Sequence, residues 1–402
     1  MTAGDRPASA PSSLVAPIAA GLVGAVTGFA SSFALVIAGL TAVGATAAEA
    51  ASGLLALCLG QALLAIVLSL RFRLPLSFAW STPGAAVLVA AGAASKGHDY
   101  TGAVGAFLVA SALMAITGFW PWLARMATSI PKPIASAMLA GILFPICVSP
   151  VTATVEHPWL ALPPIVIWLV LSRLAPRWAV PAAVVATAVA VLVAAGPDWA
   201  EGLSLAPVVT FTAPTFDPVL IVSLGVPLYL VTMAGQQIPG FTVLRAFGYE
   251  AAPTRTLLAS TGIVSAATST LGGFQVNLSA LTAAIMAGPD SHTPHERRWI
   301  AAVTGGAAYL LLAFGAGAAG ALVRASPPIL IESVAGLALL GALITAITGA
   351  LEDVPNRIVA IATFLVVASG ISIAGIGSAV WGLLAGGAIM LVLRVGRRRA
   401  AD

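Results

Sequence analysis

The stretch GGFQVNLSALTAAI, Gly272–Ile285, places two glycines and two bare amides at the head of an apolar run. The glycine pair disfavours a helix, because glycine loses more conformational freedom on folding than any other residue. We therefore expect an extended piece, Phe274–Val276, followed by a short helix that ends near Ala287. Asn277 or Ser279 is expected to cap that helix by accepting from its free backbone N–H groups. The stretch predicts a broken segment rather than a continuous helix.

The composition places this broken segment in a membrane protein. Hydrophobic residues make up 59% of the chain and charged residues 8%, and the mean hydropathy is +1.04. A soluble domain carries roughly 25% charged residues, so this chain cannot cover itself with a wettable surface. Long runs of Ala, Leu, Val and Gly favour an all-α polytopic membrane protein over a β-barrel, whose strands alternate weakly. Cys58 and Cys147 stand alone in apolar runs and are expected to be buried as small hydrophobic residues.

Fourteen candidate spans follow from dividing the chain at charged residues, prolines and glycines. Several of them, notably the sixth and the tenth, are shorter than the ~20 residues that a straight crossing needs. Their approximate limits are 14–43, 47–70, 74–93, 101–124, 133–155, 158–172, 179–195, 217–245, 255–270, 274–288, 298–323, 327–349, 355–372 and 376–394.

The basic residues support this span count and orient the chain. Cytoplasmic segments of membrane proteins are enriched in Lys and Arg. With the N-terminus inside, 16 of the 18 basic residues fall on the inner side, and the other two, Lys96 and Arg324, fall on the outer side. We therefore expect a multi-pass protein of a bacterial-type inner (plasma) membrane with both termini cytoplasmic, and the net charge of +4 predicts no nucleic-acid partner. The inner residues are Arg6, Arg71, Arg73, Arg125, Lys132, Arg173, Arg177, Arg245, Arg255, Arg297, Arg298, Arg357, Arg394, Arg397, Arg398 and Arg399.

Fourteen spans divide into two sets of seven. An odd number of spans in each half gives the halves opposite orientations, which is the inverted-repeat plan common among secondary transporters. This plan predicts irregular segments at matching places, such as spans 3 and 10. It divides the chain into an N-terminal cytoplasmic tail, a first repeat, an extracytoplasmic linker, a second repeat and a C-terminal cytoplasmic tail. Their limits are 1–13, 14–195, 196–216, 217–395 and 396–402.

Span 3 carries the counterpart of the opening stretch, LSFAWSTPGAAVL, Leu76–Leu88. Ser81 and Thr82 precede Pro83, which is the arrangement expected at a helix start, and the helix that follows is half a membrane deep. Helix N-termini leave backbone N–H groups unpaired and carry roughly half a positive charge. Two such ends near the membrane midplane favour a site for a carboxylate-sized anion or a polar ring, lined by protein rather than lipid. Kinks or packing pieces without a ligand are the alternative.

Eleven polar and aromatic residues on spans 1, 3, 8 and 10 are candidates for binding that substrate. The serines could instead bond between helices, and the glutamines could form a packing network. The aromatic residues suit a flat apolar ring but could equally belong to the core. The candidates are Ser31, Ser32, Phe78, Trp80, Ser81, Thr82, Gln236, Gln237, Phe274, Gln275 and Asn277.

Four strings of this sequence resemble those of the benzoate:proton symporters, the BenE family, and the resemblance runs over nearly the whole chain. It implies import of benzoate or a related aromatic monocarboxylate with a proton. More distantly, the chain is similar to the uracil-transporter (UraA-like) fold. That similarity implies seven-span inverted repeats with core and gate domains, strands in spans 3 and 10 that face each other across the substrate, and often a homodimer. The strings are AWSTPGAA (79–86), YTGAVGAFL (100–108), VTMAGQQIPGFTVLRAFGY (231–249) and NLSALTAAIMAGPDSH (277–292).

The chain departs from the uracil-type transporters in its binding-site acids. Those transporters carry acidic residues on spans 8 and 10, where this chain has Gln236 and Gln275. An amide can donate a hydrogen bond to an anion that a carboxylate would repel. No Asp, Glu or His lies at the centre of a span, so the proton carrier stays open. Glu332 is the deepest candidate, and the proton could instead travel on the substrate as the neutral acid or as a water-borne ion.

Other function classes fit this sequence less well. No HExxH or GxSxG string occurs, and the four histidines fall in predicted loops, so we expect no enzyme, no metal site and no cofactor. A nucleobase site is expected to offer a carboxylate to ring N–H groups, and a divalent anion is expected to need a cation. A nucleobase or other small-anion permease and an anion channel are the alternatives, and saturable uptake driven by a pH gradient would exclude the channel.

Overall fold

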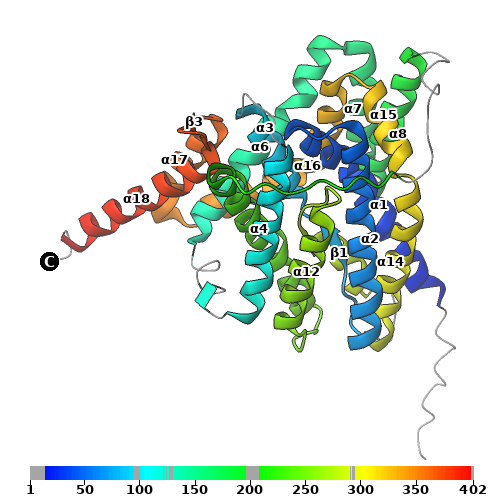
Figure 1. The fold of residues 1–402 in the computed structure, drawn as a ribbon, viewed down its shortest axis with the longest axis horizontal. Coiled ribbons are helices and arrows are strands. Elements are labelled where there is room, and N and C mark those ends of the chain that lie inside the picture. Colours follow the sequence, from blue (N-terminus) through cyan, green and yellow to red (C-terminus); the bar gives the residue numbers. More distant parts are fainter. Residues whose placement is uncertain are drawn as a thin grey trace, which may run out of the picture.

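The computed structural model describes residues 14–94, 100–120, 122, 123, 125, 130–195, 208–289, 291 and 295–399. Most of this chain is helical (Figure 1). The predicted N-terminal tail, 1–13, lies outside the described residues, as do Lys96 and the first part of the predicted linker 196–216. The helices of the N-terminal half are α1 (Val15–Ala42), α2 (Ala47–Phe72), α3 (Thr82–Ala94), α4 (Tyr100–Phe119), α6 (Lys132–Glu156), α7 (Pro158–Leu174) and α8 (Pro176–Ala195).

The C-terminal half begins with one long helix that contains two π-helical turns, η2 (Ile221–Gly225) and η3 (Met233–Gln237). A small hairpin, β3 (Ser372–Ile373) and β4 (Ile376–Gly377), precedes the last helix, which extends away from the other helices in Figure 1. The α-helices are α9 (Pro218–Leu220), α10 (Val226–Thr232), α11 (Ile238–Ala246), α12 (Thr254–Ser269), α13 (Ala280–Ala287), α14 (Trp299–Phe314), α15 (Ala316–Ala325), α16 (Pro328–Leu351), α17 (Arg357–Ala368) and α18 (Ser378–Arg399), with 3₁₀ turns at His295–Arg297 and Val354–Asn356.

The helices are those of a protein that crosses a membrane several times. Within the described residues, six helices are long and apolar enough to span a bilayer, or seven if α14 and α15, which are bent by 56°, form one span. The six are α1, α2, α4, α6, α16 and the continuous helix Pro218–Ala246. Shorter apolar helices such as α3 and α7 fall below the length that a straight crossing needs. The count of fourteen spans therefore stays a prediction.

Two short antiparallel strands lie in the interior, next to α2 and α12, and Figure 1 labels the first of them. β1 (Phe78–Trp80) pairs antiparallel with β2 (Val276–Leu278), so that Ala79 lies opposite Asn277. Two further backbone bonds extend the ladder, from the Ser81 N–H to the Gln275 carbonyl (2.8 Å) and from the Ser279 N–H to the Ser77 carbonyl (3.0 Å). This pairing satisfies backbone groups that would otherwise be unpaired at membrane depth.

Each strand leads directly into a short helix, α3 after β1 and α13 after β2. The Ser81 hydroxyl accepts from the Gly84 N–H at 3.0 Å, and the Ser279 hydroxyl accepts from the Thr282 N–H at 3.3 Å, so serine side chains cap both helices. Because the strands are antiparallel, the two helix N-termini lie at opposite ends of the strand pair. Ser81 and Ser279 are four ladder positions apart, or roughly 13 Å at the rise of a strand.

A close approach between α2 and the turn before β2 positions the strand pair. Gly272 has φ of +89°, a conformation that favours glycine. A Cβ atom added at Gly53 of α2 would lie 2.5 Å from the Gly272 carbonyl oxygen, so only glycine allows the helix this near. The Ser52 hydroxyl donates to the Leu271 carbonyl at 2.9 Å and ties the same turn to α2. The glycine pair of the opening stretch therefore ends α12 and lets β2 start against α2.

The helices pack in two groups that meet around α3. α16, α17 and α18 pack against α6, whereas α14 packs against α1 and α2, and α12 packs against α4. α3 contacts α1 and α10 on one side and α6 on the other. An exposed ion pair, Lys132–Glu352, links the start of α6 to the end of α16. α3 thus lies between the two groups of helices.

Candidate functional site

Ser81 is a junction between the strand pair and the long helix that contains η3. Its side chain is fully buried and accepts from the Thr232 hydroxyl at 2.7 Å as well as from the Gly84 N–H. Its backbone N–H belongs to the strand ladder. With these three bonds Ser81 fixes the start of α3, and its hydroxyl is already engaged by the protein.

The two adjacent glutamines of η3 have different environments. Gln237 is fully buried, donates from Nε2 to the Thr261 hydroxyl (2.9 Å) and accepts at Oε1 from the Leu278 N–H (2.8 Å). Gln236 is half-buried, and within the described part of the chain its side chain makes no hydrogen bond. A π-helical turn changes the direction in which successive side chains point, and such turns are frequent at functional sites. Here Gln237 holds β2, and the amide of Gln236 is available.

The start of α3 lies beside η3 and α6. A Cβ atom added at Gly235 would lie 3.2 Å from Pro83 Cγ and 3.6 Å from Leu139 Cδ2, so η3, α3 and α6 approach one another here. Thr82, at the first position of α3, is half-buried, and its hydroxyl has no hydrogen-bond partner among the described residues. Thr82 and Gln236 thus offer a free hydroxyl and a free amide near the positive end of a helix.

The predicted residues of the second broken segment are fully buried. Gln275 Nε2 donates to the Phe107 carbonyl and to the Ser111 hydroxyl of α4, both at 3.0 Å. The ring of Phe274 packs against Phe107, with 6.2 Å between the centroids. Asn277 Nδ2 donates to the neighbouring Leu278 carbonyl at 2.9 Å. The oxygens Gln275 Oε1 and Asn277 Oδ1 are buried without a protein partner.

Trp80 of β1 belongs to an aromatic cluster with Phe29 and Tyr309, and Ser32 of α1 is hydrogen-bonded to it. Trp80 is 1% exposed and donates from Nε1 to the Ser32 hydroxyl at 2.9 Å. Its ring meets Phe29 and Tyr309 edge to face, at centroid distances of 5.9 and 6.1 Å. Ser31 donates to the carbonyl of Gly28, one turn earlier in the same helix. Phe78 is 2% exposed, so these aromatic residues are part of the core around the strand pair.

The eleven candidates therefore lie on α1, on the segment from β1 to the start of α3, on η3, and on β2 and the residues just before it, and they differ in exposure. Most of them are buried and make hydrogen bonds or ring contacts, whereas the Thr82 hydroxyl and the Gln236 amide have no hydrogen-bond partner among the described residues. Sequence reasoning missed two partners of the strand pair, Ser77 and Thr282, whose hydroxyls lie 2.6 Å apart. Thr282 stands within the opening stretch, three positions after Ser279, where a capping partner is expected.

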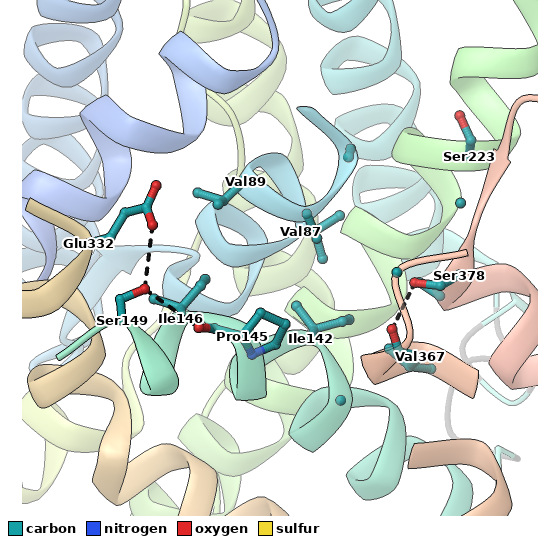
Figure 2. Close-up of a pocket in the computed structure, with 16 residues that line it drawn as sticks. Val87, Val89, Ile142, Pro145, Ile146, Ser149, Ser223, Glu332, Val367 and Ser378 are labelled. Carbon is teal, nitrogen blue, oxygen red and sulfur yellow. Dashed lines mark hydrogen bonds between the residues drawn. The ribbon is translucent and has the colours of Figure 1, made fainter. Parts of the chain in front are cut away.

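A separate cavity of about 340 Å³ lies farther along α3, between α3 and α6 (Figure 2). Val87 and Val89 of α3 form one wall, and Ile142 and Ile146 of α6 form the opposite wall. None of the eleven candidates lines it. Glu332 of α16 does, and in Figure 2 its carboxylate points toward the space between the walls.

A hydroxyl on α6 holds the Glu332 carboxylate. Ser149 Oγ donates to Glu332 Oε2 at 3.4 Å, and the hydroxyl also lies 3.5 Å from the Pro145 carbonyl. Ser149 was not predicted, although Pro145 and Pro150 within one apolar span are a sequence signal for an irregular, functional helix. Elsewhere in the described residues, no group of three or more His, Cys, Asp or Glu side chains is arranged to hold a metal ion.

The fold is similar to that of solved anion transporters. The transmembrane domain of the cyanobacterial bicarbonate transporter BicA matches 92% of this chain and 97% of its own, with a TM-score of 0.56 and 15% identity. SLC26A9 matches 94% of this chain and 66% of its own, with a TM-score of 0.61 and 12% identity. At such identities the likeness shows the fold alone. The UraA-like architecture expected from the sequence is therefore supported as a fold.

The sequence comparisons are more specific. The family model described as BenE, benzoate membrane transport protein, matches residues 11–392. The Escherichia coli inner membrane protein YdcO is 36% identical over 94% of this chain and 95% of its own. The benzoate membrane transport protein of Acinetobacter baylyi is 31% identical over 82% of this chain and 83% of its own. This chain is thus a polytopic membrane transporter and not an enzyme, and it belongs to the BenE family of benzoate membrane transport proteins.

Proposed function

We propose that this protein is a secondary active transporter that imports benzoate or a related aromatic monocarboxylate with a proton, by alternating access. Membership of the benzoate transport family supports the substrate class. The observation that carries the proposal is the pair of free polar groups, Thr82 and Gln236, beside the N-terminus of α3. None of the eleven candidate residues is acidic. A hydroxyl, an amide and a helix N-terminus stabilise a monovalent anion without a buried cation.

The candidate residues divide into two roles in this proposal. Thr82 and Gln236 contact the carboxylate, and Ser31 of α1 lies at the edge of the site. The other candidates hold the strand pair in place: Ser81 and Gln237 through hydrogen bonds, and Trp80 through its ring contacts. Ser32, Phe78, Phe274, Gln275 and Asn277 belong to the same supporting group, and a bound substrate or water would satisfy the free oxygen of Asn277.

The architecture proposed for this transporter is fourteen spans in a 7+7 inverted repeat. The repeats are 14–195 and 217–395, and each contains a buried strand that leads into a short helix, β1–α3 and β2–α13. The group of α6, α16, α17 and α18 is the gate domain, and the group around the strand pair is the core domain. Alternating access then moves one group past the other, as in other inverted-repeat transporters.

The proposed orientation has both termini in the cytoplasm. It rests on the 16 basic residues that the fourteen-span count assigns to the inner side. In this orientation the C-terminal ends of α3 and α6 and the first turns of α16 lie on the outer side. The Lys132–Glu352 ion pair then lies on the inner side.

Uptake by purified protein in liposomes tests the proposal. Neutral benzoic acid crosses lipid unaided, so the background is set by protein-free liposomes under the same pH gradient. We expect saturable initial rates of labelled benzoate uptake above this background. The rates should rise with an inward proton gradient and fall when a protonophore collapses it.

The competitor panel decides among the alternatives. Uracil, bicarbonate and sulfate should leave benzoate uptake unchanged at concentrations at which hydroxybenzoate inhibits it. Transport of a nucleobase without transport of benzoate would assign the protein to the permease alternative. A conductance that grows linearly with benzoate concentration would indicate a channel.

A further inference from the structure

The cavity between α3 and α6 has the size and lining of a site for one small aromatic molecule. Its volume is about 340 Å³, at the lower end of the range of roughly 300–1,000 Å³ for ligand pockets. Its walls are mostly aliphatic, with Val87 and Val89 facing Ile142 and Ile146 across the space in Figure 2. The hydroxyls of Ser223 and Ser378 lie at the end away from Glu332 in the same view. Such a space takes an apolar ring with one polar end.

The polar end of the cavity is formed by Glu332 and Ser149. The Ser149 hydroxyl is the hydrogen-bond partner seen for this carboxylate, and no ion pair to Glu332 is found among the side chains that the structure describes. An ionised carboxylate in an apolar wall without a cation is costly, and an approaching aromatic carboxylate would add repulsion. A proton bound between the two carboxylates removes the repulsion and turns it into a hydrogen bond.

We propose that this cavity is a second binding site for the transported aromatic acid, in which Glu332 and the bound carboxylate share one proton. The inference rests on the function proposed above and names the group that brings the proton. The ring lies between the valines of α3 and the isoleucines of α6. One proton joins two carboxylates, so the bound pair carries one negative charge in place of two.

The position of the cavity suits a site that precedes the one at the start of α3. Val87 and Ala91 line the cavity and lie five and nine residues after Thr82. At 1.5 Å per residue, these positions are about 8 and 14 Å along the helix from its N-terminus. In the proposed orientation this is the outer half of the protein. A substrate that enters from outside would meet Glu332 first and Gln236 second.

Among the side chains that the structure describes, few charged groups lie on the helices packed against Glu332. The helices packed against α16 are α1, α6, α7, α8 and α17, and α1 has no titratable side chain. Glu156, the acidic residue at the end of α6, is exposed, and its charge has the same sign as that of an ionised Glu332. The other titratable groups on these helices are Lys132, Cys147, Arg173, Arg177 and Arg357.

Calorimetry of benzoate binding to the purified protein in detergent, repeated at several pH values, tests the proposal. In detergent there is no background from benzoic acid that crosses a membrane unaided. Between about pH 5 and pH 9, wild-type affinity should fall as pH rises, by up to about tenfold per pH unit, because the bound state holds one shared proton. Glu332→Gln is neutral at every pH and should bind with an affinity that does not change with pH. Glu332→Asp should restore the pH dependence. Glu352→Gln, on the exposed ion pair, is the matched control and should behave like wild type.

A second pair of variants locates the binding. Val89→Phe fills the cavity with a ring of its own and should lower benzoate affinity at least about tenfold, the effect of losing roughly 1.4 kcal/mol. Val151→Phe, on the exposed face of α6, is its control. Wild-type affinity that does not vary with pH, or unchanged binding in Val89→Phe, would overturn the inference while benzoate uptake in liposomes still supports the proposed function. Absence of both binding and uptake would overturn the proposed function itself.

Discussion

The Oε1 atom of Gln237 accepts a hydrogen bond from the backbone N–H of Leu278 at 2.8 Å. This contact joins the π-helical turn η3 to strand β2 across 41 residues of sequence. The same amide donates to Thr261 of α12, so one fully buried side chain connects three elements. Its neighbour Gln236 makes none of these bonds, so two adjacent glutamines are expected to have separate roles.

Replacing Gln237 should destabilise the protein. Gln237→Ala leaves the Leu278 N–H and the Thr261 hydroxyl without this partner in a buried site. The expected cost is about 1–3 kcal/mol, the usual penalty for a buried polar group without a partner. A lower midpoint of thermal unfolding in detergent would show it. A midpoint equal to that of wild type would mean that the bond is not needed to hold β2.

Replacing Gln236 should impair transport and spare stability. Gln236→Ala removes a half-buried amide that has no partner in the described part of the chain, so the unfolding midpoint should stay near that of wild type. Benzoate kcat/KM in liposomes should fall about tenfold or more, because a hydrogen bond to a charged group contributes roughly 1.5–3 kcal/mol. Thr345→Ala, on the exposed face of α16, serves as the control that changes neither quantity. Wild-type uptake by the Gln236 variant would remove this residue from the site.

A methyl group at Gly240 should disrupt the contact between α11 and β2. The added Cβ atom would lie 2.6 Å from the Leu278 Cβ atom, closer than such atoms can approach. Gly240→Ala should therefore lower both the yield of folded protein and the unfolding midpoint. Gly341→Ala, on α16, is the matched control, because its Cβ atom would meet no atom within 4 Å. That variant should be stable or slightly more stable, since alanine favours a helix over glycine by roughly 0.5–1 kcal/mol. Equal midpoints for the two variants would argue against the close approach.

The indole N–H of Trp80 should contribute to the position of β1. Trp80→Phe keeps an aromatic ring in the cluster with Phe29 but removes the bond to the Ser32 hydroxyl. We expect a loss of about 1 kcal/mol in unfolding free energy and a higher KM for benzoate, since the strand leads directly into Thr82. Ser32→Ala removes the same bond from the other side and should have a similar effect. The double variant should cost little more than either single one, and additive losses would show that the two residues act independently.

The strand-to-helix junctions of the structure have causes that are local in the sequence, although β2 is Val276–Leu278 and not the expected extended piece Phe274–Val276. The pair Gly272 and Gly273 ends a helix through backbone entropy, and Ser81 and Ser279 cap helices through bonds that span three residues. The apolar composition likewise required helices in a membrane, whatever their arrangement. The distribution of Lys and Arg suggested an orientation and a span count. Both stay predictions, because the order of charged residues along the chain does not give their positions relative to a membrane.

Long-range contacts decided the rest. Sequence alone could not tell which of Gln236 and Gln237 is free, because the answer depends on Leu278 and Thr261, which reach the glutamines only in the folded chain. The amide nitrogen of Gln275, expected near the substrate, is bonded to α4. Ser149 was not considered at all, because its partner Glu332 is 183 residues away.

The sequence by itself determined that this chain is a helical membrane protein, and it predicted two irregular segments, because hydrophobicity, glycine and serine act over one or two turns of chain. Only the tertiary structure decided that these segments pair as antiparallel strands. As a result, the N-termini of α3 and α13 lie at opposite ends of the strand pair. It also decided that Glu332 lines a cavity. Strand register and cavity lining depend on which distant side chains fill the same space, and close packing settles that choice once the whole chain has folded.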